Sequence, residues 1–352
     1  MFGDVLTGQV IAEIPLYGVS MTRGFGMGEF RGSFQLDQTG MSNRDLINAT
    51  QEGRCYLVCE RENEAIWGGF VKTRTYQGQA KSYQLFALAW EHYPEYRFMR
   101  RDAIDYVNAE QLTIFIDLWS IMMSDDPNSI QFTLPTTAVT VTKNLSAKGF
   151  EFVYYRELMD QLANADDGFD WTVDIARVEN VYSKSLRIGY PTLGASNPVD
   201  FDYPGQIVNY WHNGSMADRG THFYGVGAGE GSTMLTQEVI HSDLISSGFP
   251  RYDQYVSLKS ISDPTILAGL TTQRAIVKKP GIPTLTVELK ADQLPQFGSY
   301  GLGDAARVNF TGDPRHPDPV DQIFNTRILG WEYYPPQDTH TEMARIVFEG
   351  EQ

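Results

Sequence analysis

Several features that would point to a particular class of protein are scarce in this sequence. Its 352 residues include two cysteines and only 28 basic side chains against 44 acidic ones. No apolar run approaches the roughly 18 residues that a membrane-spanning helix needs. The first residues lack the basic stretch and apolar segment of a secretory signal. We therefore predict no membrane segment and expect the chain to be made and kept in a cytoplasm.

The two cysteines, Cys55 and Cys59, give little reason to expect a covalent crosslink. If residues 54–60 form a strand, the two lie about 13 Å apart, which is beyond disulfide reach. On a helix they would lie one turn apart, so this conclusion depends on the strand assignment. We expect reduced, partly buried thiols and neither a disulfide nor a metal site.

The net charge is −16 and it is unevenly distributed. Residues 1–100 carry 11 acids and 10 bases, residues 101–200 carry 15 and 7, and residues 201–352 carry 18 and 11. Such a protein will not bind nucleic acid by neutralising phosphates. A repulsive acidic wall would instead let DNA pass without adsorbing. The simpler interpretation is that the excess charge only keeps the protein soluble.

Residues 54–90 read as a three-stranded β-meander, with strands at about 54–60, 66–75 and 81–90. Both faces carry apolar residues, which suits a barrel wall that packs against something on each side. Trp67 is followed by Gly68 and Gly69, which weaken the strand but permit a bulge or a close approach of another backbone. We interpret this stretch as the corner of a curved sheet.

The rest of the chain alternates between strand and helix patterns. Glycine-rich residues 23–36 read as a bulged strand, and residues 45–50 as a turn of helix. Asn108 is the expected N-cap of a helix that ends at Asp125. Helical patterns also cover about 152–165 and, after an N-cap at Ser262–Asp263, about 264–277. Further expected elements are a hairpin of 169–175 with 185–190, a linker at 191–204, and strands at 284–290, 305–310, 326–333 and 343–348.

Glycine occupies alternate positions at Gly225, Gly227 and Gly229, so an extended strand there would have a face without side chains. A nucleotide-binding loop is not expected, because the lysine that such a loop requires is missing here and in residues 23–36. We interpret 224–231 as a strand over which another chain lies closely.

No catalytic constellation is evident. The histidines are scattered, and neither a nucleophile elbow nor an activated cysteine motif occurs. The acidic residues at 166–174 lack the ligand pattern of a calcium loop. A glycosidase pair of carboxylates is recognised only by its separation in space, so the sequence leaves it open. We expect no cofactor, no metal and no enzymatic activity. The six histidines are His92, His212, His222, His241, His316 and His340.

Short motifs spread over most of the chain resemble, in the same order, minor tail proteins of siphophages that infect actinobacteria. They include residues 66–76 with Trp67, residues 89–93, residues 167–171, the alternating glycines at 225–231, and residues 247–250. Gly303–Asp304 and the run that begins at Arg327 complete the series. The resemblance is to the tail hub, which is related in fold to Tal-type tail-tip proteins and to the baseplate hub of contractile phages.

This resemblance implies a mainly β, α+β fold with two tube-like β-barrel domains and an α+β insertion. The corresponding boundaries are 1–100 for the first barrel, 101–195 for the α+β domain and 196–352 for the second barrel with one helix. It also implies a homotrimer at the tail tip of the virion, assembled in the host cytoplasm, whose acidic channel lets DNA pass without specific binding.

The expected partners are a distal ring protein at the tube end, other tail-tip and receptor-binding proteins, and the tape measure protein. Because the chain stops after its last strand, host binding and any lysis are expected on other polypeptides. Two alternatives remain: a hexameric distal tail ring protein, and a carbohydrate-binding or wall-cleaving tail protein that uses the abundant aromatic residues. The assembly candidates are Trp67, Gly68, Gly69, Gly225, Gly227, Gly229, Gly303, Asp304 and Arg327.

Overall fold

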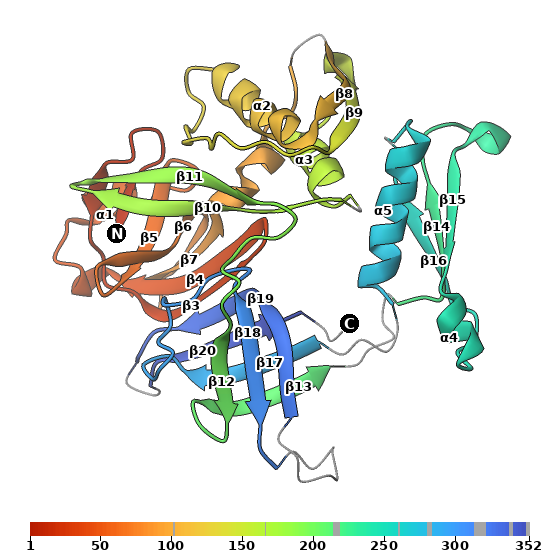
Figure 1. Cartoon of the computed structure of the whole chain (residues 1–352). Helices are drawn as coiled ribbons and strands as arrows, with labels where there is room; N and C mark the ends of the chain where they lie inside the picture. The colour runs from red at the N-terminus through yellow and green to blue at the C-terminus, as the bar shows by residue number, and fades with distance from the viewer. Residues whose placement is uncertain are drawn as a thin grey trace.

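A computed structural model describes residues 1–100, 103–165, 167–213, 219–259, 261–279, 284–312, 322–337 and 341–349. Within these residues, thirteen strands form one continuous sheet, ordered β13-β17-β20-β19-β3-β4-β7-β6-β5-β1-β2, with β18 and β12 branching from β19. Two curved halves of this sheet lie one above the other in Figure 1. A helix-containing α+β part covers the upper half, and a second small module lies to one side. The mainly β, α+β class is confirmed.

The first half contains the predicted meander. β5, β6 and β7 pair antiparallel in sequence order, and β4 continues the sheet beyond β7. Ladder irregularities lie between Cys59 and Glu60 and between Val71 and Thr73, on either side of the glycine pair. The elements are β1 (Phe2–Asp4), β2 (Val10–Ala12), β3 (Tyr17–Gly24), β4 (Met27–Gln35), η1 (Leu36–Gln38), α1 (Asn43–Ala49), β5 (Cys55–Arg61), β6 (Glu64–Gln77), β7 (Ser82–Ala89) and η2 (Trp90–Tyr96).

The second half is nearly barrel-shaped. Its strands follow the order β12-β18-β19-β20-β17-β13, and a short turn joins β12 to β13. β12 pairs in parallel with β18, although about 100 residues separate them in the chain. These strands are β12 (Val199–Tyr203), β13 (Ile207–Asn213), β17 (Thr284–Lys290), β18 (Ala305–Phe310), β19 (Gln322–Tyr334) and β20 (Met343–Phe348).

β19 joins the two halves. Its first part pairs with β18, and after an irregularity between Ile328 and Gly330 it pairs with β3. Neither half therefore closes into a barrel among the described residues, whereas the sequence predicted two tube-like barrels. One apolar core that contains Phe2, Trp67, Val287 and Phe348 runs through both halves. The sheet interior is shared because a single strand contributes to both.

The α+β part covers the outer face of the first half. Its helices and hairpin form a second core with Tyr56, Phe70 and Trp90, so the meander is buried on both faces, as predicted. Figure 1 shows β10 and β11 lying across this face. The elements are β8 (Ala103–Glu110), α2 (Gln111–Ser124), β9 (Thr142–Lys148), η3 (Gly149–Glu151), α3 (Tyr155–Ala163), β10 (Asp170–Val178) and β11 (Val181–Gly189).

Two local predictions were wrong. The N-cap of α2 is Glu110, whose carboxylate accepts hydrogen bonds from the backbone N–H groups of Leu112 and Thr113, whereas Asn108 lies within β8 at φ 51°. The expected linker at 191–204 ends in strand β12. Both features have local signs: Glu110 caps the helix through residues two and three positions later, and Val199, Phe201 and Tyr203 alternate with aspartates as in a strand.

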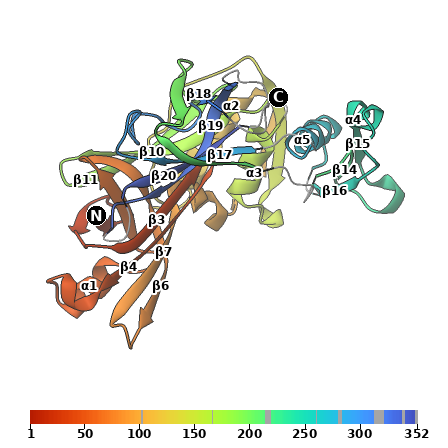
Figure 2. The same cartoon turned by 90° about the horizontal axis from the view of Figure 1, so that it is seen from below.

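A second inserted module, unforeseen in the sequence, follows β13. A three-stranded sheet ordered β15-β14-β16 packs against one long helix, α5. Figure 2 shows this module at the opposite end of the molecule from α1 and the tip of β6. Its elements are β14 (His222–Val226), η4 (Gly231–Thr233), β15 (Thr236–Ile240), α4 (Ser242–Ser246), β16 (Asp253–Ser257) and α5 (Pro264–Val277).

Candidate assembly surfaces

Trp67 and the two glycines after it sit where the first half of the sheet meets its neighbours. The Trp67 indole Nε1 donates to the Thr22 carbonyl oxygen at 3.0 Å. A Cβ on Gly68 would lie 2.3 Å from Ile175 of the β10–β11 hairpin, and one on Gly69 would lie 1.9 Å from the Leu88 carbonyl oxygen. The expected close backbone approach is therefore present, and it occurs within one chain.

Two of the three alternating glycines, Gly225 and Gly227, lie beneath α5. A Cβ on Gly225 would lie 1.9 Å from the Thr271 hydroxyl oxygen, because α5 packs directly on β14. Gly227 is similarly close to the Ile261 carbonyl oxygen, at 2.7 Å. Gly229, outside the strand, has φ +116°, a conformation that favours glycine. A helix of the same chain thus covers the face over which the sequence suggested another chain.

Gly303 and Asp304 fasten β18 to the segment before β12. Gly303 has φ +84°, and a Cβ there would lie 1.9 Å from the Leu193 carbonyl oxygen. The Asp304 carboxylate accepts hydrogen bonds from the backbone N–H groups of Ala195 and Gly301, both at 2.7 Å. These contacts anchor the chain as it passes from the α+β part into the second half of the sheet.

Arg327 links three parts of the chain. It forms ion pairs with Asp170 of β10 and with Glu349, the latter at 2.9 Å, and its guanidinium lies 5.5 Å from the centre of the Phe25 ring. Burial disfavours the charged guanidinium, but the Asp170 and Glu349 carboxylates together outweigh this and raise the pKa of Arg327. β19 places Arg327 opposite Ala305, next to Gly303 and Asp304, whereas the glycines at 225–229 belong to the inserted module.

Two further arginines, which sequence reasoning missed, join the same parts. Arg61 of β5 pairs with Glu342 at 2.6 Å, and each side chain is 13% exposed. Burial favours neutral Glu342, but hydrogen bonds from Arg61 and Tyr333 outweigh it and lower the pKa of the carboxyl. Arg23 of β3 lies 3.4 Å from buried Glu91.

The Glu91 carboxylate in turn accepts hydrogen bonds from the Thr172 hydroxyl and the Val173 backbone N–H of β10. Charged groups thus hold the α+β part and the two sheet halves in one arrangement. Single arginines carry no spacing motif, so only spatial proximity identifies these contacts.

The described residues hold no group of three or more histidine, cysteine, aspartate or glutamate side chains that could bind a metal ion. Cys55 and Cys59 are free, as predicted. In the part of the chain that the structure describes, no helix combines the length and hydrophobicity that crossing a membrane requires. Asp166, His316 and His340 lie outside the described residues.

The exposed surface carries one concentration of aromatic side chains that the sequence analysis did not single out. Tyr96 and Phe98, and then Phe150, Phe152 and Tyr154, are 38% to 72% exposed, and the acidic Glu151 between Phe150 and Phe152 is exposed as well. We call these five residues the aromatic ridge. The signal was present as aromatic residues at every second position in two short segments, where a strand pattern would place polar residues.

No protein-family model and no curated protein sequence matches the chain. Solved structures do. The prophage MuSo2 43 kDa tail protein from Shewanella oneidensis superimposes with a TM-score of 0.62 at 12% identity, over 94% of this chain and 93% of that one. The tail protein from Neisseria meningitidis MC58 gives a TM-score of 0.57 at 9% identity, over 95% and 91%. The chain has the fold of phage tail proteins.

A third similar structure comes from a different kind of machine. It is an Escherichia coli component of the type VI secretion system, described as structurally similar to the T4 bacteriophage tail proteins gp27 and gp5. Its TM-score is 0.51 at 9% identity, over 97% of this chain and 77% of that one. The tail-protein fold thus accounts for nearly the whole chain, including the α+β part and the inserted module.

Proposed function

We propose that this protein is a structural component of a phage tail, the hub at the tail tip, where it closes the tail tube as a homotrimer. The observation that carries this proposal is the likeness to tail proteins over more than nine tenths of the chain. The two curved sheet halves also support it, because β19 and the Arg61–Glu342 ion pair join them into one unit. In this proposal the boundaries at residues 100 and 195 separate the tube-like parts from the α+β part.

The proposed role is mechanical and not catalytic. The chain occupies the virion tail tip after assembly in the host cytoplasm, between a tube-end ring and other tip proteins, with the tape measure protein inside. We further propose that the acidic chain lines a channel through which DNA passes. The chain does not bind this DNA. The net charge of −16 supports this part.

Native mass spectrometry of the purified protein tests the assembly directly. We expect a species of three times the 39.7 kDa chain mass. A species of six chains would favour a distal tail ring protein. A monomer that stays monomeric when mixed with its tail partners would contradict the proposal.

The non-catalytic role is tested separately. Incubation with host cell wall is expected to release neither reducing sugars nor muropeptides. Their release would show a wall-cleaving tail protein. In a reconstructed tail, basic side chains lining the channel would contradict the proposed acidic channel. They would not contradict the proposal that the chain is the hub.

A further inference from the structure

The aromatic ridge is built as a rigid surface and is not a frayed loop. The backbone N–H of Met99 donates to the Val153 carbonyl at 2.9 Å, and that of Tyr155 donates to the Arg97 carbonyl at 2.9 Å. Met99 and Tyr155 point inward and are fully buried. Their neighbours Phe98 and Tyr154 therefore point outward from an ordered pair of segments.

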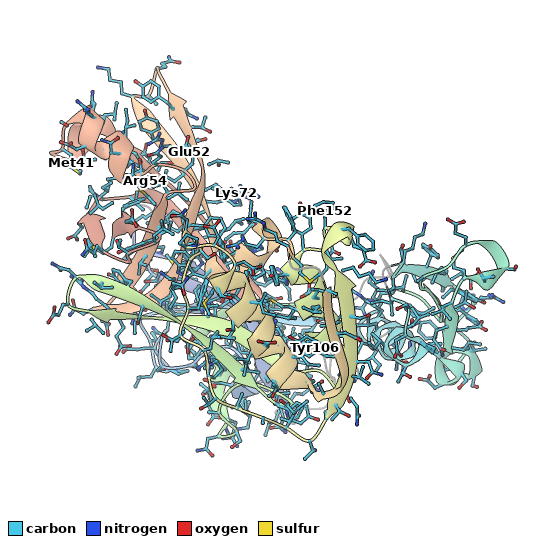
Figure 3. The ribbon with its side chains drawn as sticks, turned by 90° about the horizontal axis from the view of Figure 1, so that it is seen from above. Met41, Glu52, Arg54, Lys72, Tyr106 and Phe152 are labelled. Carbon is cyan, nitrogen blue, oxygen red and sulfur yellow. The ribbon has the colours of Figure 1, made fainter. Side chains whose placement is uncertain are left out.

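The ridge rings also contact one another. The Phe98 ring centre lies 5.5 Å from that of Phe152 and 6.3 Å from that of Tyr154, both in edge-to-face geometry. Phe152 has φ 52° and ψ 39°, a left-handed conformation that is unfavourable for a bulky side chain. Figure 3 shows Phe152 on the same margin of the molecule as Lys72. A strained backbone thus presents a phenylalanine that is 63% exposed.

The exposed apolar area of the ridge is the size of a functional patch. About half the surface of five aromatic side chains, at roughly 200 Å² each, is on the order of 500 Å². Patches of roughly 300–600 Å² are the largest on ordinary monomers and are often binding sites, and a standard interface buries about 800 Å² per partner. The ridge alone could supply more than half of one side of an interface.

Cations flank the ridge. The Lys148 ammonium lies 5.7 Å from the centre of the Phe150 ring, and that of Lys72 lies 5.9 Å from the centre of the Tyr96 ring. Within the described residues, neither lysine forms an ion pair. On a chain with 44 acidic and 28 basic side chains, this combination favours an occupant that is both apolar and acidic.

Such a surface exists on the inserted module. Because α5 covers one face of the sheet β15-β14-β16, alternation places Tyr224, Glu238, Ile240, Asp253 and Tyr255 on the other face. We call these five residues the open sheet face. Ile240 is 46% exposed and Tyr255 is 63% exposed. Of the two carboxylates beside them, Asp253 forms an ion pair with Arg251 at 2.8 Å, whereas Glu238 has no cation paired with it among the described residues.

The open sheet face cannot meet the ridge of its own chain. In Figures 1 and 2, α5 lies between the sheet and the rest of the molecule, so this face points away from the α+β part. Each chain therefore carries one aromatic, lysine-flanked surface and one aromatic, carboxylate-bearing surface, directed apart. Two different surfaces of this kind form a heterologous contact, in which one surface of each copy binds the other surface of the next. Such contacts form a ring when the rotation from one copy to the next returns to the first copy.

We propose that the aromatic ridge of one copy docks on the open sheet face of a second copy. This inference rests on the proposed trimer and names the residues that join its subunits outside the sheet halves. Lys72 and Lys148 would meet the Glu238 carboxylate of the neighbouring open sheet face, while Phe150 and Phe152 pack against its Ile240 and Tyr255.

Sedimentation velocity of the full chain with paired variants tests the contact. The ridge variant is Phe150→Ser with Phe152→Asn, because asparagine tolerates the left-handed conformation. The face variant is Ile240→Ser with Tyr255→Ser. Each variant alone is expected to self-associate at least tenfold more weakly than the unchanged chain. Raising the salt concentration should weaken the self-association of the unchanged chain.

Mixing the two variants gives the sharpest outcome. Each retains one intact surface, so a one-to-one mixture should form a heterodimer that neither variant forms alone, and it should form no ring. The control Val178→Ser removes a comparably exposed apolar side chain, 65% exposed, at the hairpin tip and should associate like the unchanged chain. Thermal unfolding of each variant checks that it is folded.

Three results would overturn the inference. In the first, the unchanged chain stays monomeric at about 100 μM, a concentration at which even weak contacts are populated. In the second, the ridge variant self-associates as strongly as the unchanged chain. In the third, the mixture of the two variants forms no heterodimer. If the ridge variant does not fold, the self-association of the face variant and the salt dependence of self-association in the unchanged chain still test the proposed contact. The proposed function is contradicted by a different result, namely assembled tails that do not contain three copies of the chain at the tip. Failure of the contact and failure of the proposed function can therefore be told apart.

Discussion

Replacing Lys184 with methionine should stabilise the protein near neutral pH. Lys184 is 7% exposed, its ammonium lies 4.9 Å from the centre of the Trp90 ring, and it donates to the Val5 carbonyl at a long 3.4 Å. Desolvation lowers the pKa of Lys184 from 10.5 to about 8. At about 1.36 kcal/mol per pKa unit, the buried charge costs roughly 3 kcal/mol below pH 8.

The net gain is smaller than this cost, because the substitution also removes the contacts with Val5 and Trp90. We expect Lys184→Met to raise the free energy of unfolding by about 1–2 kcal/mol at pH 7. The sign with pH follows from proton binding. Between pH 8 and 10.5 the unfolded chain holds the Lys184 proton more tightly than the folded chain does, so the contribution of this group to stability rises with pH and levels off above 10.5.

Urea unfolding followed by tryptophan fluorescence measures both effects. The difference between Lys184→Met and the unchanged chain should shrink as the pH rises from 7 to 10.5. Lys259→Met, at an exposed lysine, is the matched control and should change stability by less than about 0.5 kcal/mol. A Lys184→Met protein that is less stable at pH 7, or a difference that does not depend on pH, would show that burying the Lys184 charge does not destabilise the fold.

Three further outcomes are expected. Gly225→Val should destabilise the inserted module by about 1–3 kcal/mol, because its side chain would collide with Thr271, and hydrogen exchange should quicken in β14 and α5 but not in the control Gly78→Ala. Arg61→Met should cost about 3–5 kcal/mol in urea unfolding by leaving Glu342 buried without its cation, and an unchanged midpoint would contradict that role. The contribution of Glu342 should be present above pH 4.5 and lost as the pH falls below it, so Glu342→Gln should flatten the acid limb of stability against pH.

Much of the sheet could be read from local patterns. Strands at 284–290, 305–310 and 343–348 occur at the predicted residues, because each alternates apolar and polar side chains over a single buried face. The meander was recognisable for the opposite reason: it is apolar on both faces and packs against two cores. In these segments the signal lies within the element itself.

Other elements depend on partners that are distant in sequence. Strand β12 follows a Gly-, Pro- and Ser-rich stretch, and its one local sign is the alternation of Val199, Phe201 and Tyr203 with two aspartates. Its parallel pairing with β18 is long-range and no local pattern encodes it. The joining of the two sheet halves depends on β19 changing partners after Ile328, which no local pattern encodes. Arg61 and Glu342 lie 281 residues apart in the chain. Long-range pairing therefore limits what one sequence can show.

The candidate assembly residues illustrate the same limit. The sequence drew attention to glycines because they permit close contact, and the structure shows close contact at Gly69, Gly225 and Gly303 with neighbours in the same chain. Glycine spacing does not say whether the neighbour belongs to the chain or to another copy. The aromatic residues at Phe150 and Phe152 stand at alternate positions in the sequence, but only the structure shows that both are exposed.

The central claim is that three copies of this chain close a tail tube. A cryo-electron microscopy reconstruction of tails that carry the protein, with symmetry determined from the density at the tip, tests it most directly. We expect three copies related by a threefold axis at the end of a sixfold tube. Six copies at that position, or tails whose tip lacks the chain, would contradict it.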